Sequence, residues 1–326
     1  MTARHPGRPS IVALGEPMVE FNQARADAPD SYLRGFGGDT SNMAIAAARL
    51  TDGAGRVGYV TRVGDDAFGR MLLELWRCEG VDTKGVAVDP SAPTGVYFVS
   101  HGPRGHEFSY LRAGSAASRM TPETLPRDVV AGASILHVSG ITQAISGTAC
   151  DTVFAAIELA EASGARVSYD SNLRSKLWPL ARARAIVMAT IAQCDWFLPS
   201  LDEARTLSGY EQPEAIIDWC HALGAPVVAL KCGAEGVVVS DGRRREAIAG
   251  HRVDCVDATG AGDCFDGAYA ARALAGDSPF EAARYANAAA ALATTGFGAV
   301  APLPRDGAVR ALLATAVTRD AAARVR

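Results

Sequence analysis

Short apolar runs alternate with longer segments of helical periodicity along most of this chain. The runs at 11–14, 134–138 and 227–230 have the character of buried strands, and 148–162 has that of a helix. This alternation is typical of a mostly parallel sheet covered by helices. The length of 326 residues fits one large α/β domain or two smaller ones, and the 48% of residues that are hydrophobic suffice for a sizeable core. Further strands are expected over 57–63, 166–169, 196–198 and 244–248, and further helices over 41–50, 66–78, 261–275, 279–295 and 305–316.

Two early segments interrupt the alternation, at about 17–36 and about 93–113. The second contains apolar residues near Val96 and Phe98, a turn at 102–105 and a second extended run, which together indicate a hairpin without an intervening helix. Because the two segments have the same extended character, we expect them to form a small, exposed β-sheet beside the main domain.

Charge and cysteine usage exclude several classes of protein. The formal net charge is −4 and there are no long charged runs, which argues against a nucleic-acid partner or a polybasic membrane patch. No apolar run is long enough to span a bilayer. The seven cysteines are scattered and form no C-x-x-C pair, as expected for reduced thiols in the cytoplasm rather than for a disulfide framework or metal cluster.

The run D-A-T-G-A-G-D at 257–263 is the strongest chemical signal. It places Gly260 and Gly262 where a loop enters a helix, so that unpaired amides and the helix dipole can hold phosphate oxygens. Asp263, at the mouth of this anion hole, could accept a proton from a hydroxyl that attacks a phosphoryl group. The alternative is that Asp263 only complements the dipole of the helix.

A second glycine-rich turn precedes the helix expected at 41–50. Gly37 and Gly38 are followed by Asp39 and Asn42, and then by a run of small residues on which a ligand could pack. The alternative is an ordinary glycine turn with a Ser or Asp N-cap.

Together, in this order, the two turns resemble the signatures of the PfkB/ribokinase family of carbohydrate kinases. Residues 37–50 are similar to its Gly-Gly motif, and 257–263 match its D-x-T-G-A-G-D motif at every position. The resemblance covers essentially the whole chain. It implies a ribokinase-like three-layer α/β/α core with a small β-sheet lid, Asp263 as the base, and the amides of Ala261, Gly262 and Asp263 as the anion hole.

The resemblance also implies a nucleotide site for ATP. The turn after the strand at 227–230 is similar to the family's G-x-x-G loop, although by itself it could be a plain β-turn. Glu203 matches the acid of the family's N-x-x-E motif, which helps to place Mg²⁺ through water. The alternative is that Glu203 is a solvated helix carboxylate. Ser200 stands where that motif has Asn, which puts the contact made by the Asn in doubt. The residues expected to bind the nucleotide are Ser200, Lys231, Gly233, Gly236, Thr259, Gly260, Gly262 and Asn287.

Two arginines, each of which could be a surface charge, bear on the sugar. Arg112 and Arg174 lie in stretches that resemble the 2-keto-3-deoxygluconate kinase branch, and arginine holds carboxylates bidentately. Their roles at the carboxylate, the keto end and the phosphoryl group cannot be divided from the sequence. The stretch 296–300 lacks an acid that some members of the branch have. The residues expected to bind the substrate are Gly38, Asp39, Asn42, Tyr97, Tyr110, Arg112, Asn172, Arg174 and Asp263.

The expected activity is ATP-dependent phosphorylation of the 6-hydroxyl of 2-keto-3-deoxygluconate. The alternatives are a fructokinase or another neutral-sugar kinase and, in a different class, a non-catalytic sugar or nucleotide sensor. A dinucleotide-binding site is excluded because only Gly15-Glu16-Pro17 follows the first strand. A monovalent cation near the 257 loop and a homodimer formed through the lid are further expectations.

Overall fold

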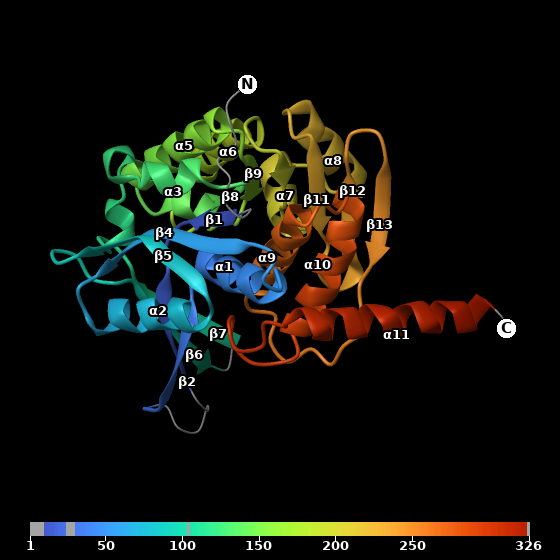
Figure 1. Ribbon diagram of the computed structural model, residues 1–326, viewed down its shortest axis with the longest axis horizontal. Coiled ribbons are helices and arrows are strands. Elements are labelled where there is room, and N and C mark those ends of the chain that lie inside the picture. The colour runs from blue at the N-terminus through green and yellow to red at the C-terminus, as the bar shows by residue number, and fades with distance from the viewer. Residues whose placement is uncertain (1–9, 24–29, 103–104, 325–326) are drawn as a thin grey trace.

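A nine-stranded sheet forms the centre of the computed structural model, which describes residues 10–23, 30–102 and 105–324 (Figure 1). The strand order is β13-β12-β11-β10-β9-β8-β1-β4-β5. Neighbouring strands are parallel except at β11–β12 and β12–β13. The strands are β1 Ser10–Leu14, β4 Arg56–Gly64, β5 Val81–Asp89, β8 Ile135–Ser139, β9 Arg166–Asp170, β10 Trp196–Phe197, β11 Val227–Lys231, β12 Gly236–Ser240 and β13 Arg245–Ala249.

Helices cover both faces of this sheet because its central strands are apolar on both sides. In β1, Ile11 and Ala13 contribute to one buried cluster, whereas Val12 and Leu14 contribute to the other. The first cluster includes α1 Asp39–Leu50, α2 Ala67–Cys78, α9 Ala261–Leu274, α10 Pro279–Ala293 and α11 Asp306–Arg324. The second includes α3 Arg127–Ala131, α5 Gly147–Ala162, α6 Leu180–Ile191, α7 Leu201–Ser208 and α8 Pro213–Ala222. The short α4 is Gly140–Ala144.

A second, four-stranded sheet lies to one side of the main sheet, at the lower left of Figure 1. Its order is β3-β2-β6-β7, with β2 parallel to β6 and the other pairs antiparallel. The strands are β2 Met18–Gln23, β3 Tyr32–Gly37, β6 Val96–Gly102 and β7 Gly105–Leu111. We call this sheet the lid. Residues 24–29 and 103–104, which fall in the expected insertions, lie outside the described residues.

The layers and the lid confirm the predicted fold class, and three local features differ from expectation. Strand β5 was not predicted, because polar side chains interrupt the apolar ones in it. Helix α11 continues beyond the predicted end at 316 to Arg324 and extends away from the body of the molecule (Figure 1). Strand β2 was expected to be exposed, but it is largely buried because β6 pairs with it and Phe68 of α2 packs against its Phe21.

The carboxyl ends of the parallel strands meet at one edge of the main sheet. Glu16 follows β1, Asp170 ends β9 and Lys231 ends β11. Strand β1 pairs with β4 on one side and β8 on the other, which creates the crevice where open α/β sheets bind ligands. Helices α1 and α9 also begin near this edge. No helix in the described part of the chain is long and apolar enough to cross a membrane.

Candidate active site

Asp263 lies in the first turn of α9 and is held by a residue from the other end of the chain. Its Oδ2 accepts a hydrogen bond of 2.8 Å from Asn42 Nδ2 in the first turn of α1. Both side chains are buried. The structure therefore brings together the two residues that the sequence placed in separate glycine-rich turns.

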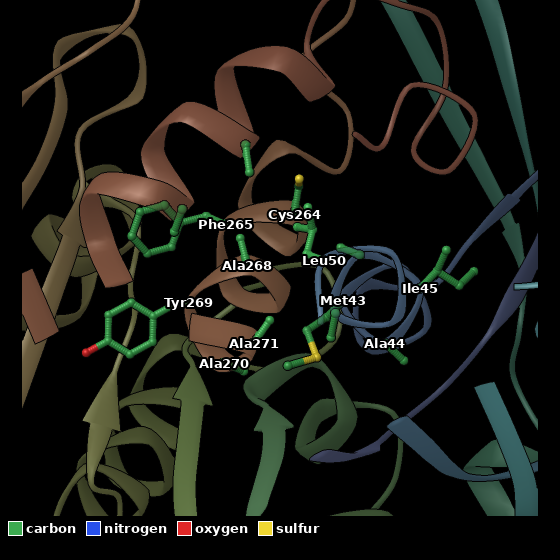
Figure 2. Close-up of a cluster of buried hydrophobic side chains, with 14 of the residues drawn as sticks. Met43, Ala44, Ile45, Leu50, Cys264, Phe265, Ala268, Tyr269, Ala270 and Ala271 are labelled. Atoms are coloured by element: carbon green, nitrogen blue, oxygen red, sulfur yellow. The ribbon is translucent and has the colours of Figure 1, made fainter. Parts of the chain in front are cut away.

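The close packing of α1 against α9 makes this contact possible. A Cβ atom at Gly267 would lie 2.5 Å from the Met43 carbonyl oxygen, so only glycine fits there without moving a helix. Figure 2 shows Met43 and Leu50 on the side of α1 that faces α9, whereas Ile45 points away from it. The small residues of both helices therefore let their first turns lie side by side.

Two amides at the start of α9 are available to an anion. Gly260, the N-cap, has a φ of 76°, which favours glycine. The Ala261 N–H already donates to the Ala258 carbonyl oxygen at 3.2 Å. Within the described residues, the N–H groups of Gly262 and Asp263 have no acceptor. Two of the three predicted anion-hole amides are thus unpaired, and Ala261 has an internal partner.

Gly262 is a glycine for which the fold gives no steric reason. Its φ is not positive, and a Cβ there would make only an ordinary contact, 3.6 Å from Lys231 Nζ. A side chain at this position would narrow the space above the unpaired amides. This favours the interpretation that the turn leaves room for a bound group.

Burial raises the pKa of Asp263 well above its usual range, and the negative charge of Asp39 adds to this effect. The Asn42 hydrogen bond and the positive charge of Lys231 act in the opposite direction. An ionised carboxylate whose pKa is raised is a stronger base than an exposed one. The electrostatics therefore favour proton abstraction by the ionised form of Asp263.

Arg112 is paired to a buried carboxylate that the sequence analysis did not identify. The Arg112 guanidinium contacts Glu16, which also accepts a 2.8 Å hydrogen bond from Ser115 Oγ. Glu16 is almost fully buried, and this burial raises its pKa despite the arginine. The Nε atom of Arg112 is buried and has no hydrogen-bond partner in the described structure. Arg112 is therefore fixed in place with a donor left for a ligand.

Two tyrosines of the lid lie next to this arginine. The rings of Tyr97 and Tyr110 are stacked with their centroids 5.8 Å apart, and the Arg112 guanidinium lies 5.7 Å from the Tyr110 ring centroid. The Tyr97 hydroxyl donates to Glu20, another buried carboxylate absent from the predicted site. The two lid tyrosines and Arg112 are therefore neighbours.

Arg174 connects the two halves of the site. One of its terminal nitrogens lies 3.3 Å from Asp39 Oδ1 and the other lies 3.5 Å from Glu203 Oε1. Glu203 also accepts a 2.8 Å hydrogen bond from Ser171 Oγ. Burial, together with the charge of Asp170, raises the pKa of Glu203 to about 7. The predicted sugar-side arginine and the predicted magnesium-side carboxylate are therefore neighbours.

The strand end that precedes Arg174 supplies a further unpaired acceptor. Asn172 has a φ of 34°, and its N–H donates to Asp170 Oδ1 at 3.1 Å. Its side-chain Oδ1 is buried without a partner, as is Oδ1 of Asn42. Buried amide oxygens that lack a partner are rare in folded proteins. Both belong to the predicted substrate residues, which supports a polar ligand there.

The predicted nucleotide residues have mostly structural contacts. Asn287 Nδ2 donates to the Ala249 carbonyl oxygen at 2.8 Å, and Thr259 donates to Asp257 through its N–H and its hydroxyl. Gly236 has a φ of 106°, and a Cβ there would lie 2.1 Å from the Ile248 carbonyl oxygen. Gly233 lies in the turn between β11 and β12 with a φ of 60°. Ser200 is the N-cap of α7 and forms an isolated parallel β-bridge with Lys231.

Four carboxylates of the site were missed as functional candidates. Glu16 and Glu20 belong to the first segment of the chain, whereas Asp170 and Asp266 lie near Lys231. The sequence offered one usable signal, which is that Glu16 and Asp170 stand at the carboxyl ends of apolar strands.

Comparison with known proteins gives consistent results. The model of the pfkB family of carbohydrate kinases matches residues 8–306. The chain is 36% identical over 311 residues to 2-dehydro-3-deoxygluconokinase of Thermoproteus tenax, covering 91% of this chain and 92% of that one. It is 34% identical over 325 residues to fructokinase-1 of Zea mays, covering 94% and 98%. These two identities do not separate the two substrates.

The fold matches a solved kinase-like structure over nearly its whole length. That crystal structure is of an E. coli protein provisionally described as ribokinase II, in complex with ATP and Mg²⁺. It superposes with a TM-score of 0.87 at 25% identity and covers 94% of this chain and 99% of that one.

Proposed function

Because this chain belongs to the pfkB family of carbohydrate kinases, we propose that it transfers the γ-phosphoryl group of ATP to the 6-hydroxyl of 2-keto-3-deoxygluconate. The observation that carries the proposal is Arg112, fixed by Glu16 with a buried Nε donor that lacks an acceptor. A substrate carboxylate supplies such an acceptor, and the guanidinium fork fits it.

In the proposed reaction, Asp263 removes the proton of the attacking hydroxyl. Asn42 holds Oδ2 of the carboxylate, which leaves Oδ1 to accept that proton. The unpaired amides of Gly262 and Asp263 hold oxygens of the transferred group, and the dipole of α9 stabilises its charge. Closure of the lid tyrosines over the sugar would exclude water, which limits hydrolysis of ATP.

The donor set near Glu203 fits a magnesium ion held mostly by phosphate and water. Within the described residues, no three His, Cys, Asp or Glu side chains gather as a metal site. Mg²⁺ commonly takes only one or two protein carboxylates beside nucleotide phosphates, so Glu203, acting through water, suffices. When bound, Mg²⁺ would neutralise phosphate charge. Arg174, which pairs with both Glu203 and Asp39, is proposed to contact the phosphoryl group as it passes to the sugar.

A coupled assay of ADP release with several acceptors tests the proposal. The expected order of kcat/KM is 2-keto-3-deoxygluconate above fructose and ribose. Asp263→Asn should lower kcat by ~10²–10⁴-fold because it removes the general base. Turnover by this variant close to wild type would refute the assignment of the base.

A second variant addresses the carboxylate. Arg112→Ala should raise KM for the sugar acid much more than KM for ATP, and should have less effect on KM for fructose. The enzyme is a neutral-sugar kinase if two results are found together. The wild type prefers fructose as acceptor, and Arg112→Ala raises KM for the sugar acid and KM for ATP equally. The identity of 34% to a maize fructokinase makes this the second candidate.

The lid also supports the expected homodimer. Its side chains Leu33 and Leu111 are 65% and 67% exposed, and Phe108 is also exposed. Exposed apolar strands of this kind pair between subunits more readily than polar ones. Light scattering after gel filtration measures the mass, and substitution of Leu33 by a charged residue should shift a dimer toward the monomer.

A further inference from the structure

A buried cluster of three charged side chains lies below the turn that begins α9. Lys231 Nζ is 2.9 Å from Asp170 Oδ2 and 3.0 Å from Asp266 Oδ1. The side chains of Asp170 and Asp266 are buried, and that of Lys231 is mostly covered, with 11% exposed. Lys231 ends β11, Asp170 ends β9 and Asp266 lies one turn after Asp263 in α9. The ammonium group therefore ties two strands of the sheet to the first turns of the helix that carries Asp263.

The ammonium is also next to the anion hole. A Cβ at Gly262 would lie 3.6 Å from Lys231 Nζ, which places the positive charge directly beside the residue whose N–H has no acceptor. A fixed positive charge at that distance adds to the potential of the amides and the helix dipole. Any anion bound at the Gly262 turn would be attracted by it.

Structural stability alone is a weak reason for such a cluster. Removing charged groups from water costs free energy, and apolar residues of similar volume often stabilise a protein more than a buried ion pair does. The cluster has two carboxylates for one ammonium. Its position beneath the anion hole gives it a function that apolar residues could not supply.

We propose that Lys231 is a positioning residue for phosphoryl transfer. It holds the start of α9 through Asp266 and keeps the Gly262 turn positive without itself bonding the nucleotide. This inference rests on the proposed role of Asp263 as the base, and it differs from the direct nucleotide contact that the sequence analysis assigned to Lys231.

The charged groups around Asp263 predict how the loss of Lys231 should change the pH dependence of kcat/KM. Burial raises the pKa of Asp263, and the ammonium of Lys231 opposes this rise. Removal of the ammonium should therefore raise the pKa of Asp263 further and move the acid limb of kcat/KM to higher pH. The charged groups that face Asp263 or Lys231 from the packed elements are Asp39 of α1, His137 of β8, Asp170 of β9, Arg174 of the following loop, Glu203 of α7 and Asp266 of α9.

The test compares Lys231→Gln with Lys84→Gln, which removes the same charge from an exposed site on β5. Both variants are assayed with ATP and the sugar that the wild type phosphorylates best. Lys231→Gln should lower kcat by ~10–100-fold, less than the loss of a direct oxyanion donor. KM for ATP should stay within about threefold of wild type, and the acid limb of kcat/KM should move to higher pH. Lys84→Gln should match the wild type.

Three outcomes would overturn the inference. They are a kcat equal to that of Lys84→Gln, a loss confined to KM for ATP, and an acid limb that does not move. A loss confined to KM for ATP would mean that Lys231 contacts the nucleotide directly. Asp263→Asn in the same assay separates the two proposals. If Asp263→Asn is inactive and Lys231→Gln is fully active, only the role of Lys231 fails; if Asp263→Asn is active, the proposed base fails.

A double variant keeps the test usable if Lys231→Gln does not fold. Lys231→Met with Asp170→Asn removes one positive and one negative buried charge together. Because these two charges act on the pKa of Asp263 in opposite directions, the acid limb should return toward wild type. The kcat should stay low, since no ammonium remains beside Gly262. A double variant with wild-type kcat would refute the inference.

Discussion

His137 is a buried histidine in β8 that lies close to the charged cluster of the site. It is 2% exposed, and its Nδ1 is 3.0 Å from Ser168 Oγ on the neighbouring strand β9. Burial, together with the positive charge of Lys231, lowers the pKa of His137 from 6.5 to about 4, although Asp170 acts in the opposite direction. The folded protein therefore keeps this ring neutral at pH values where an exposed histidine is charged.

The lowered pKa has a consequence for stability that can be worked out with its sign. Between pH 6.5 and pH 4 the unfolded chain binds a proton at His137 that the folded chain does not bind. This contribution to the free energy of unfolding is fully present above pH 6.5 and is lost progressively as the pH falls from 6.5 to 4. At about 1.4 kcal/mol for each pKa unit, the total loss is about 3 kcal/mol, most of it reached by pH 4.5.

Urea unfolding between pH 7.5 and pH 4.5 measures this loss in wild type and in His137→Gln. The wild type should lose about 2–3 kcal/mol more than the variant over this range, because the amide of Gln does not titrate. Ser168→Ala is the control, since it removes the hydrogen bond and keeps the ring. It should lower stability without changing the slope against pH. Parallel pH profiles for wild type and His137→Gln would refute the reasoning.

Two further predictions concern the contact between α1 and α9. Gly267→Ala should lower the free energy of unfolding by about 1–3 kcal/mol in a urea titration, because its Cβ would lie 2.5 Å from the Met43 carbonyl oxygen. The control in the same titration is Gly147→Ala, because a Cβ at Gly147 has no neighbouring atom within 4 Å. Asn42→Ala removes a hydrogen bond that lowers the pKa of Asp263, so the acid limb of kcat/KM should move to higher pH; an unchanged pH–rate profile would contradict this role.

The main strands could be predicted because a strand that is buried on both faces is a continuous apolar run. The run Ile11 to Leu14 and the run at 227–230 are of this kind, and both are central strands. Strand β5 lies at the edge of the sheet, where one side of the ladder is unpaired and polar side chains such as Lys84 reach solvent. Its pattern therefore did not differ enough from that of a loop.

The pairing of the buried carboxylates of the site could not be predicted, because their partners are distant in the sequence. Glu16 and Arg112 are 96 residues apart, and Glu20 and Tyr97 are 77 apart. An isolated acid in an extended segment is most often exposed, and nothing local indicates a partner. Lys231 was assigned to the nucleotide from its loop, but the direction of its side chain depends on Asp170 and Asp266, which only the fold brings near.

The contact between Asn42 and Asp263 joins residues that are 221 positions apart, and this separation affects how the chain acquires activity during synthesis. At ~5–20 residues per second, roughly 10–45 s pass between the emergence of α1 from the ribosome and that of α9. During this interval the apolar side of α1 that carries Met43 and Ala47 has no α9 to cover it. A nascent chain arrested before residue 263 would thus be inactive and prone to bind chaperones, and release of the last fifth of the sequence would complete both the core and the catalytic pair.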